Sequence, residues 1–214
     1  MDNIKNTNGV QLRTIYLAGG CFWGIEKLMK SLPGVKNVTN GYANGTCEDD
    51  ANYETVCSGR AGFRETVKVE YDPAETALEA ILASYFYVID ATQENRQGPD
   101  VGAQYQTGIY YEPDDEKTKS VVEHAARIEE DEIDRIRVRG GVHSFIYFCV
   151  EIEPLRNFYP AEEYHQDYLD KNPNGYCHVS LKKMRLLSQL SLAGISYDKP
   201  AAQLIDEYAR TQGL

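Results

Sequence analysis

The chain has 214 residues, of which 42% are hydrophobic and 26% are charged, and its formal net charge is -11. This composition is typical of one well-cored globular domain with or without an appendage. The acidic balance argues against a nucleic-acid or anionic-membrane partner, because both need clustered basic residues. No apolar run approaches the ~20 residues that span a bilayer, and the first residues lack the pattern of a secretory signal, so we expect a cytoplasmic protein.

The first half of the chain is predicted to alternate strands and helices. Residues 1–12 are polar and are expected to be flexible. After them, helical spacing of apolar residues and strand-type alternation define the elements. They are a strand over 14–18, a helix from about 21 to 32, a strand over 35–42, a surface loop over 43–52, a strand over 65–71 and a helix over 76–88.

The second half is predicted to contain longer loops. A polar loop covers 90–103, and long loops in compact domains are often functional. The elements after it are a strand over 105–111, a charged helix over 113–135, a strand over 144–152, a short helix over 160–169 and a turn over 171–175. Several strands alternate like half-exposed ones, which favours an α+β fold over a buried parallel sheet.

A thiol, two large rings and two glycines occur together in the pentapeptide Gly20-Cys21-Phe22-Trp23-Gly24. It lies where the first predicted strand turns into the first predicted helix. Unpaired N–H groups and the positive end of the helix dipole favour an anion there, and a thiolate is an anion. The sequence therefore predicts an activated cysteine beside an aromatic pocket.

Glu65 occupies an unusual position in the strand over 65–71. The period of two places it on the same face as Val67, Val69 and Tyr71. Desolvation on that face would raise the pKa of the carboxyl group and keep it protonated near neutral pH, as a general acid requires. The alternative is that Glu65 begins the strand and reaches solvent at its edge.

Three further residues are candidates for contact with a substrate. Tyr53 and Tyr105 could donate hydroxyl protons toward a reacting oxygen, and Asp100, in the long loop, could orient a polar group. The alternative for each tyrosine is a packing role with a satisfied hydroxyl, because the chain contains 16 tyrosines.

The chain has five cysteines, an odd count, and it is too large and too poor in cysteine to be a disulfide scaffold. A reducing compartment with selected reactive thiols is more plausible. Cys57 and Cys149 are expected to be inert buried thiols, and Cys47, in an acidic loop, to be exposed and slow to react. Cys177 follows a glycine-containing turn, which suits a mobile resolving thiol, although an incidental cysteine is the alternative. No Cys-x-x-Cys pair or spaced histidine set predicts a metal site.

Together these residues resemble the A-type peptide-methionine sulfoxide reductases. The matching segments are Gly20 to Gly24, Gly41-Tyr42-Ala43, Tyr53 to Gly59, Gly62 to Glu65, Tyr71-Asp72-Pro73, Asn95 to Gly98, Asp100-Val101-Gly102, Gln104-Tyr105, Asn157 to Glu162, Tyr164-His165-Gln166 and Asn172 to Cys177. The resemblance covers about residues 13–180, which we take as the catalytic domain. Residues 181–214 are then a C-terminal extension, predicted to be helical and to pack on the domain.

The resemblance implies a role for each candidate residue. Cys21 would be the nucleophile and Glu65 the acid, Tyr53 and Tyr105 would donate to the oxygen, and Asp100 would orient the substrate. The rings of Phe22 and Trp23 would receive the S-methyl group. The implied fold is a two-layer α+β sandwich of ferredoxin-like type.

The resemblance also implies a reaction cycle. Methionine S-sulfoxide would be reduced with formation of a Cys21 sulfenic acid, which would condense with Cys177 to a disulfide that thioredoxin reduces. No cysteine follows Cys177, which implies a two-cysteine cycle. The expected role is repair of oxidised protein by a monomer without a cofactor.

Two short segments depart from the family pattern. The chain has Ile89-Asp90-Ala91 where the family commonly has His-Asp-Pro, and Gly62-Phe63-Arg64-Glu65 where it has Gly-His-Ala-Glu. These changes put efficiency in doubt more than reaction type. The alternative functions are a thiol peroxidase, which needs no methyl pocket, and a redox-sensing interaction module in which Cys21 merely becomes oxidised.

Overall fold

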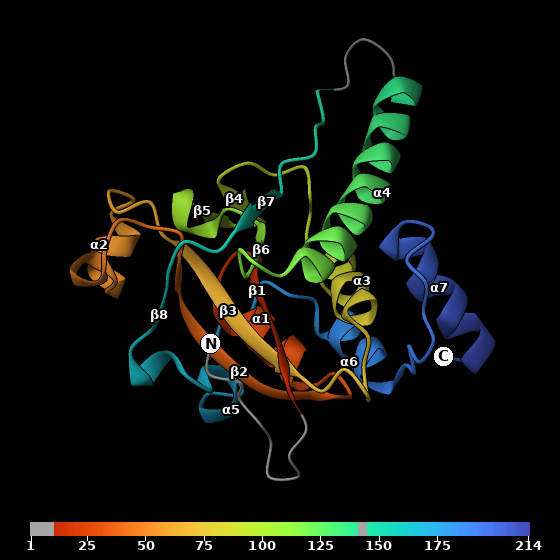
Figure 1. Ribbon diagram of the computed structural model, residues 1–214, viewed down its shortest axis with the longest axis horizontal. Helices are drawn as coiled ribbons and strands as arrows, with labels where there is room; N and C mark the ends of the chain where they lie inside the picture. Colours follow the sequence, from red (N-terminus) through yellow and green to blue (C-terminus); the bar gives the residue numbers. More distant parts are fainter. Residues whose placement is uncertain (1–10, 141–144) are drawn as a thin grey trace.

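The computed structural model describes residues 11–140 and 145–214 (Figure 1). Most of the predicted flexible segment 1–12 therefore lies outside the described residues. The strands of the main sheet are β1 (Arg13–Ala18), β2 (Val35–Ala43), β3 (Arg64–Tyr71), β6 (Gly108–Tyr111), β7 (Glu151–Pro154) and β8 (Phe158–Pro160). The helices are α1 (Phe22–Lys30), α2 (Tyr53–Cys57), α3 (Leu78–Val88), α4 (Glu116–Gly140), α5 (Tyr168–Lys171), α6 (Leu181–Gln189) and α7 (Ala201–Gln212).

The main sheet is mixed, with strand order β7-β6-β1-β3-β2-β8. Its neighbouring strands are antiparallel except for β6 and β7, which run parallel. Leu17 on β1 lies opposite Val67 on β3. The start of β3, where Glu65 lies, is therefore beside the end of β1, from which the chain turns to Cys21. The predicted α+β class is confirmed.

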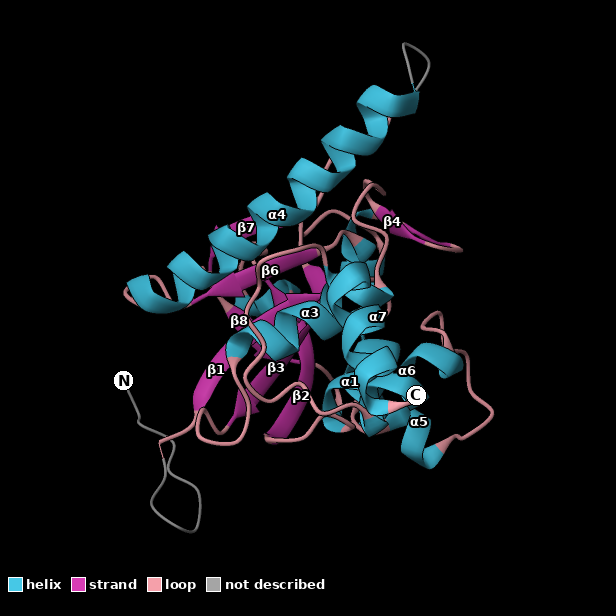
Figure 2. Ribbon diagram, turned by 90° about the vertical axis from the view of Figure 1, so that its right-hand side faces the viewer, coloured by secondary structure: helices cyan, strands magenta, loops and turns pink. Residues whose placement is uncertain are grey.

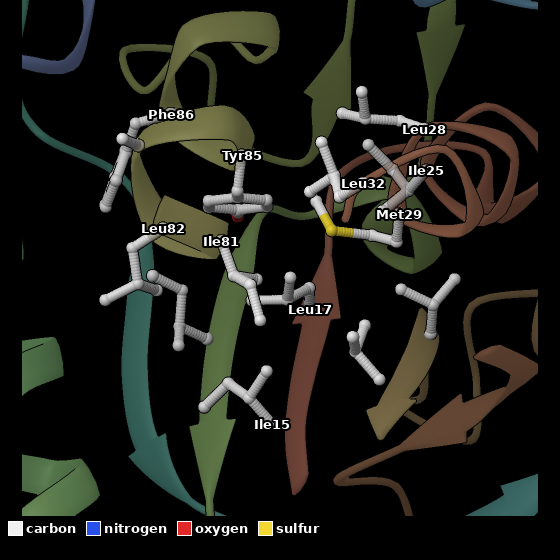
Figure 3. Close-up of a cluster of buried hydrophobic side chains, with 14 of the residues drawn as sticks. Ile15, Leu17, Ile25, Leu28, Met29, Leu32, Ile81, Leu82, Tyr85 and Phe86 are labelled. Carbon is white, nitrogen blue, oxygen red and sulfur yellow. The ribbon is translucent and has the colours of Figure 1, made fainter. Parts of the chain in front are cut away.

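The core lies between the sheet and the two helices that follow its first and third strands in sequence, α1 and α3. Alternate residues of β1, Ile15 and Leu17, lie in one buried cluster with side chains of both helices (Figure 3). Ile25 of α1 and Ile81 of α3 belong to the same cluster, because apolar residues recur in both helices at helical spacing. Tyr85 adds a hydrogen bond from its hydroxyl to Ala18 O at 2.7 Å, which fixes α3 over the end of β1.

The C-terminal extension packs on the same side of the molecule. Helix α7 lies against α3, and Figure 2 shows it beside α6. Helix α4 packs on α3, β6 and β7, and its far end extends beyond the sheet. No helix among the described residues has the length and apolar character that crossing a bilayer requires.

The predicted helix over 160–169 is wrong. The chain there forms the end of β8, a short 3-10 turn (Glu163–His165) and α5. Gln166 interrupts a continuous helix, because its side chain accepts from Asn40 N at 2.9 Å and donates to Asn40 O at 3.0 Å, as a neighbouring strand would. Asp167 then takes a left-handed conformation with φ of 56°, which a regular helix does not contain.

Two predicted strands are shorter than expected. Of the strand over 144–152, residue 144 lies outside the described residues, and regular pairing begins only at Glu151. The strand over 105–111 begins at Gly108, because Ala103–Tyr105 forms a 3-10 turn. The loop over 90–103 contains a small ribbon of β4 (Arg96–Gln97) and β5 (Asp100–Val101), so Asp100 lies in a paired strand.

Candidate active site

The turn between β1 and α1 places Cys21 at the N-terminal end of α1. Gly20 has φ of +84°, a conformation that favours glycine, so the chain reverses there before the helix begins at Phe22. Cys21 is the N-cap residue of α1, and its side chain makes no capping hydrogen bond. The strand-to-helix turn predicted from the sequence is confirmed.

The resting state of Cys21 differs from the expected thiolate. The side chain is only 7% exposed, and burial raises its pKa well above the ordinary value, with a further rise from the nearby Glu65. The N–H of Trp23 acts in the opposite direction but is outweighed. Cys21 is therefore a protonated thiol at rest, because the loss of hydration exceeds what one helix N-terminus provides.

Glu65 lies beside the same helix terminus. Its Oε2 accepts from the Phe22 N–H at 3.1 Å, and the residue is 2% exposed. Burial raises its pKa from 4.5 to about 8, although the hydrogen bond from Phe22 acts against this rise. The carboxyl group is therefore neutral at pH 7, and the predicted desolvation of Glu65 is confirmed.

A cavity of about 160 Å³ opens over these two groups. Its lining residues are Cys21, Phe22, Trp23, Tyr53, Glu65, Asp100, Tyr105 and Tyr176. Seven of the eight site residues predicted from the sequence thus meet around one space. The eighth, Cys177, is half-buried and follows Tyr176, but is not among the lining residues.

Hydroxyl groups line the polar side of the cavity. Burial raises the pKa of both Tyr53 and Tyr105 above the ordinary value, so both hydroxyls keep their protons. Cys57, one helical turn away on α2, adds to the rise in the pKa of Tyr53. The Tyr176 hydroxyl donates to Asp100 Oδ2 at 2.9 Å and so connects the loop of Asp100 with the segment of Cys177.

The aromatic side of the cavity is held rigidly. The ring of Trp23 stacks on Tyr168 with centroids 3.7 Å apart and an interplanar angle of 13°. Its indole N–H donates to His165 Nδ1 at 3.2 Å, and His165 is 1% exposed. Since burial lowers the pKa of His165, the ring stays neutral and Nδ1 remains available as the acceptor.

No role is predicted from the sequence for three residues of this site, which are His165, Tyr168 and Tyr176. His165 and Tyr176 lie within segments that carry the family resemblance, and this was the signal that could have identified them. The erroneous helix over 160–169 concealed the positions of His165 and Tyr168, which fold against Trp23 only because that helix is interrupted.

The remaining cysteines lie outside the cavity. The expectation that Cys57 is buried is wrong: it is exposed, because its segment forms the short surface helix α2 rather than a packed strand. Cys149 is half-buried and donates weakly to Thr92 O at 3.5 Å. Cys47 is exposed, as expected.

Comparison with known proteins identifies the family. The family model described as peptide methionine sulfoxide reductase matches residues 13–191. The chain belongs to this family. Curated relatives named peptide methionine sulfoxide reductase MsrA are 46% identical over 168 residues in Clostridium acetobutylicum and 43% identical over 174 residues in Alkaliphilus metalliredigens. These alignments cover 78% and 80% of this chain, and 95% and 99% of the relatives.

Solved structures of family members have the same fold. Methionine sulfoxide reductase A of Corynebacterium diphtheriae is similar with a TM-score of 0.65 and 32% identity, over 81% of this chain and 83% of that one. Reduced Mxr1 from Saccharomyces cerevisiae is similar with a TM-score of 0.63 and 34% identity, over 81% and 92% of the two chains. The family model ends at residue 191, so α7 lies beyond the part it matches.

Both departures from the family pattern lie outside the lining of the cavity. Phe63 is buried, with its ring 6.4 Å from Tyr42 and 6.0 Å from Tyr159 between centroids. Arg64 forms an ion pair with Glu151 at 2.8 Å. Ile89 packs near Gly19. These side chains supply no group to the lining of the cavity.

Proposed function

We propose that this chain reduces the S-sulfoxide of methionine, free or in peptides, with Cys21 as nucleophile and Glu65 as general acid. The observation that carries the proposal is the pairing of a buried thiol and a neutral carboxyl group in one small cavity with an aromatic side. A sulfoxide presents a sulfur to attack, an oxygen to protonate and an apolar methyl group. The cavity offers a partner for each.

The first step is an oxygen transfer that balances without an added cofactor. The Cys21 sulfur attacks the sulfoxide sulfur, and Glu65 gives its proton to the oxygen, which moves to Cys21 as the sulfenic acid. Methionine leaves, and the thiol proton restores Glu65. A pKa of about 8 suits this role, because the carboxyl group is protonated at neutral pH and can still release its proton.

The other groups of the cavity orient the sulfoxide. Tyr53 and Tyr105, kept protonated by burial, donate to the oxygen as negative charge develops there. Phe22 and Trp23 receive the methyl group, and the stacking of Trp23 on Tyr168 keeps that wall fixed. Asp100, held by Tyr176, orients a polar group of the substrate.

The second step recycles the enzyme. The Cys177 sulfur attacks the sulfenic sulfur of Cys21, a disulfide forms, and the oxygen leaves as water. A dithiol protein, by family likeness thioredoxin, then reduces the disulfide by exchange and becomes oxidised itself. Tyr176, the residue before Cys177, lines the cavity together with Cys21, so the segment of Cys177 borders the site.

The proposal extends to the domain organisation, oligomeric state and location of the enzyme. Residues 13–180 form the catalytic domain, of ferredoxin-like type, and residues 181–214 an extension packed on it. The element order β1-α1-β2-β3-α3-β6, with sheet order β6-β1-β3-β2, supports the ferredoxin-like description. We further propose a cytoplasmic monomer that repairs oxidised protein, in keeping with five free cysteines.

A thiol count tests the mechanism. The reduced protein, mixed with excess methionine sulfoxide and no reductant, should lose two thiols per chain and release methionine, and peptide mapping should find Cys21 linked to Cys177. In the Cys177→Ser variant, one methionine per chain should still be released and Cys21 should remain a sulfenic acid. A link from Cys21 to Cys57 or Cys47 would remove Cys177 as the resolving residue.

The same assay separates the alternative functions. A thiol peroxidase would turn over hydrogen peroxide faster than methionine sulfoxide when a dithiol is supplied. A redox sensor would oxidise without any catalytic release of methionine. Faster turnover of methionine S-sulfoxide than of peroxide or the R-epimer is the expected result.

A further inference from the structure

The segment that carries Cys177 has no regular structure of its own. Residues 172–180 connect α5 to α6 without helix or strand. The thiol of Cys177 donates only weakly, to Val179 O at 3.4 Å within the same segment. Cys177 packs against the hydrophobic core, and its neighbours in sequence, Tyr176 and His178, add hydrogen bonds that fix its position further.

His178 is bonded to the turn that carries the nucleophile. Its Nε2 lies 2.8 Å from the carbonyl oxygen of Gly19, two residues before Cys21. A carbonyl oxygen only accepts, so Nε2 carries the proton and donates. Burial lowers the pKa of His178, so the ring stays neutral, and its Nδ1 is buried without a hydrogen-bond partner among the described residues.

The two glycines that flank the catalytic residues make room for this ring. A Cβ atom on Gly20 would lie 3.2 Å from His178 Nε2, and a Cβ on Gly24 would lie 3.2 Å from both Cε1 and Nδ1. The Gly24 Cβ would also come within 2.9 Å of Val179 Cγ2. The pentapeptide is thus shaped at both ends to receive the segment that contains Cys177.

We propose that His178 is a positioning residue for disulfide formation, and that its bond to Gly19 holds Cys177 beside Cys21. This inference rests on the proposed function, in which Cys177 attacks the Cys21 sulfenic sulfur and water leaves. The reaction couples two thiols of one chain, so its rate follows the local concentration of Cys177 at Cys21. A bond to Gly19 confines an irregular segment that would otherwise spread over a larger volume.

The bond acts on the second step alone. His178 does not line the cavity in which the sulfoxide binds. Its loss should therefore leave the attack of Cys21 on the sulfoxide unchanged and slow the attack of Cys177. A merely structural residue would affect both steps, or neither.

Rapid mixing of reduced protein with methionine sulfoxide, without reductant, separates the two steps. In His178→Ala, methionine release should match the wild type, whereas disulfide formation should be roughly five- to tenfold slower, as expected for one lost hydrogen bond. A dione probe specific for sulfenic acid should label Cys21 for correspondingly longer. His178→Gln, which retains a donor that can reach Gly19, should recover most of the rate.

His124 provides a matched control. Its Nε2 lies 2.9 Å from Tyr197 O, a similar bond between a histidine and a carbonyl, and His124 does not line the cavity. His124→Ala should leave both steps unchanged. Gly24→Ala keeps His178 but places a Cβ atom 3.2 Å from its ring and 2.9 Å from Val179 Cγ2, so it should slow disulfide formation. It serves if His178→Ala does not fold.

The outcomes distinguish this inference from the proposed function. Wild-type rates of disulfide formation in His178→Ala would overturn the positioning role, and so would equal slowing of methionine release. Failure of the wild type to release methionine, or to link Cys21 to Cys177, would overturn the proposed function itself.

Discussion

Two regions of the molecule each place a glutamate against a helix N-terminus, and the two carboxyl groups have different roles. In the cavity, Glu65 accepts one bond, from Phe22 N–H at 3.1 Å. Where the C-terminal extension contacts α4, Glu129 accepts two hydrogen bonds on one oxygen, from the Tyr197 hydroxyl and from Ala201 N–H, both at 2.6 Å. Burial raises the pKa of both carboxyl groups.

The difference lies in how completely each carboxyl group is satisfied. Glu129 uses short bonds to fasten the first turn of α7 and the preceding loop to α4, so its role is stability. Glu65 is more deeply buried and less well paired, so it retains its proton at neutral pH. An incompletely satisfied carboxyl group destabilises the fold but is available for chemistry.

Exchange of each carboxylic acid for an amide should separate the two regions most clearly. Glu65→Gln should slow methionine release at pH 7 by roughly 10²–10⁴-fold, because the amide cannot supply a proton to the sulfoxide oxygen. The matched control Glu129→Gln should keep the wild-type rate of release. Single-turnover measurements with methionine sulfoxide check both, and an unchanged rate in Glu65→Gln would remove Glu65 as the acid.

The free energy of unfolding should depend on pH differently in the wild type and in Glu65→Gln. The pKa of Glu65 is about 8 in the folded protein and 4.5 ordinarily, so the folded state binds the proton more tightly. The stability that this group contributes should therefore be greatest below about pH 4.5 and be lost as pH rises through 8, by roughly 5 kcal/mol in total. Glu65→Gln should lack this decline, as urea unfolding at several pH values would reveal.

An activity profile offers an independent check on this pKa. Methionine release should be nearly constant below about pH 8 and fall above it, as Glu65 loses its proton. A profile that falls instead below pH 6 would indicate a group that must be ionised, and would contradict the assignment.

The smallest effect on activity is expected where α4 contacts the N-terminus of α7. Glu129→Ala should lower the free energy of unfolding by about 2–3 kcal/mol, because it leaves the Tyr197 hydroxyl and the Ala201 N–H without their acceptor. Methionine release should stay within about twofold of the wild type, and Tyr197→Phe should cost about 1 kcal/mol. A large loss of activity in Glu129→Ala would mean that the two regions are coupled.

Prediction from sequence succeeded where a local pattern decides the structure. The strict alternation around Val67 and the helical spacing in α1 and α3 predicted those elements nearly to their bounds, because each buries one face. The prediction that Cys57 is buried failed because the five residues of α2 are too few to display a helical period. The interrupted helix near Gln166 failed because that side chain bonds to the backbone of β2, far away in sequence.

The sequence by itself determined the reactive thiol, the aromatic residues beside it and the carboxylate on an apolar strand face, since all three follow from local spacing. Only the tertiary structure decided their protonation. Burial keeps Cys21 a thiol and raises the pKa of Glu65 to about 8, and burial depends on which distant segments cover them. The supports at His165, Tyr168 and His178 were likewise decided by packing, because each meets the Cys21 turn from more than 140 residues away.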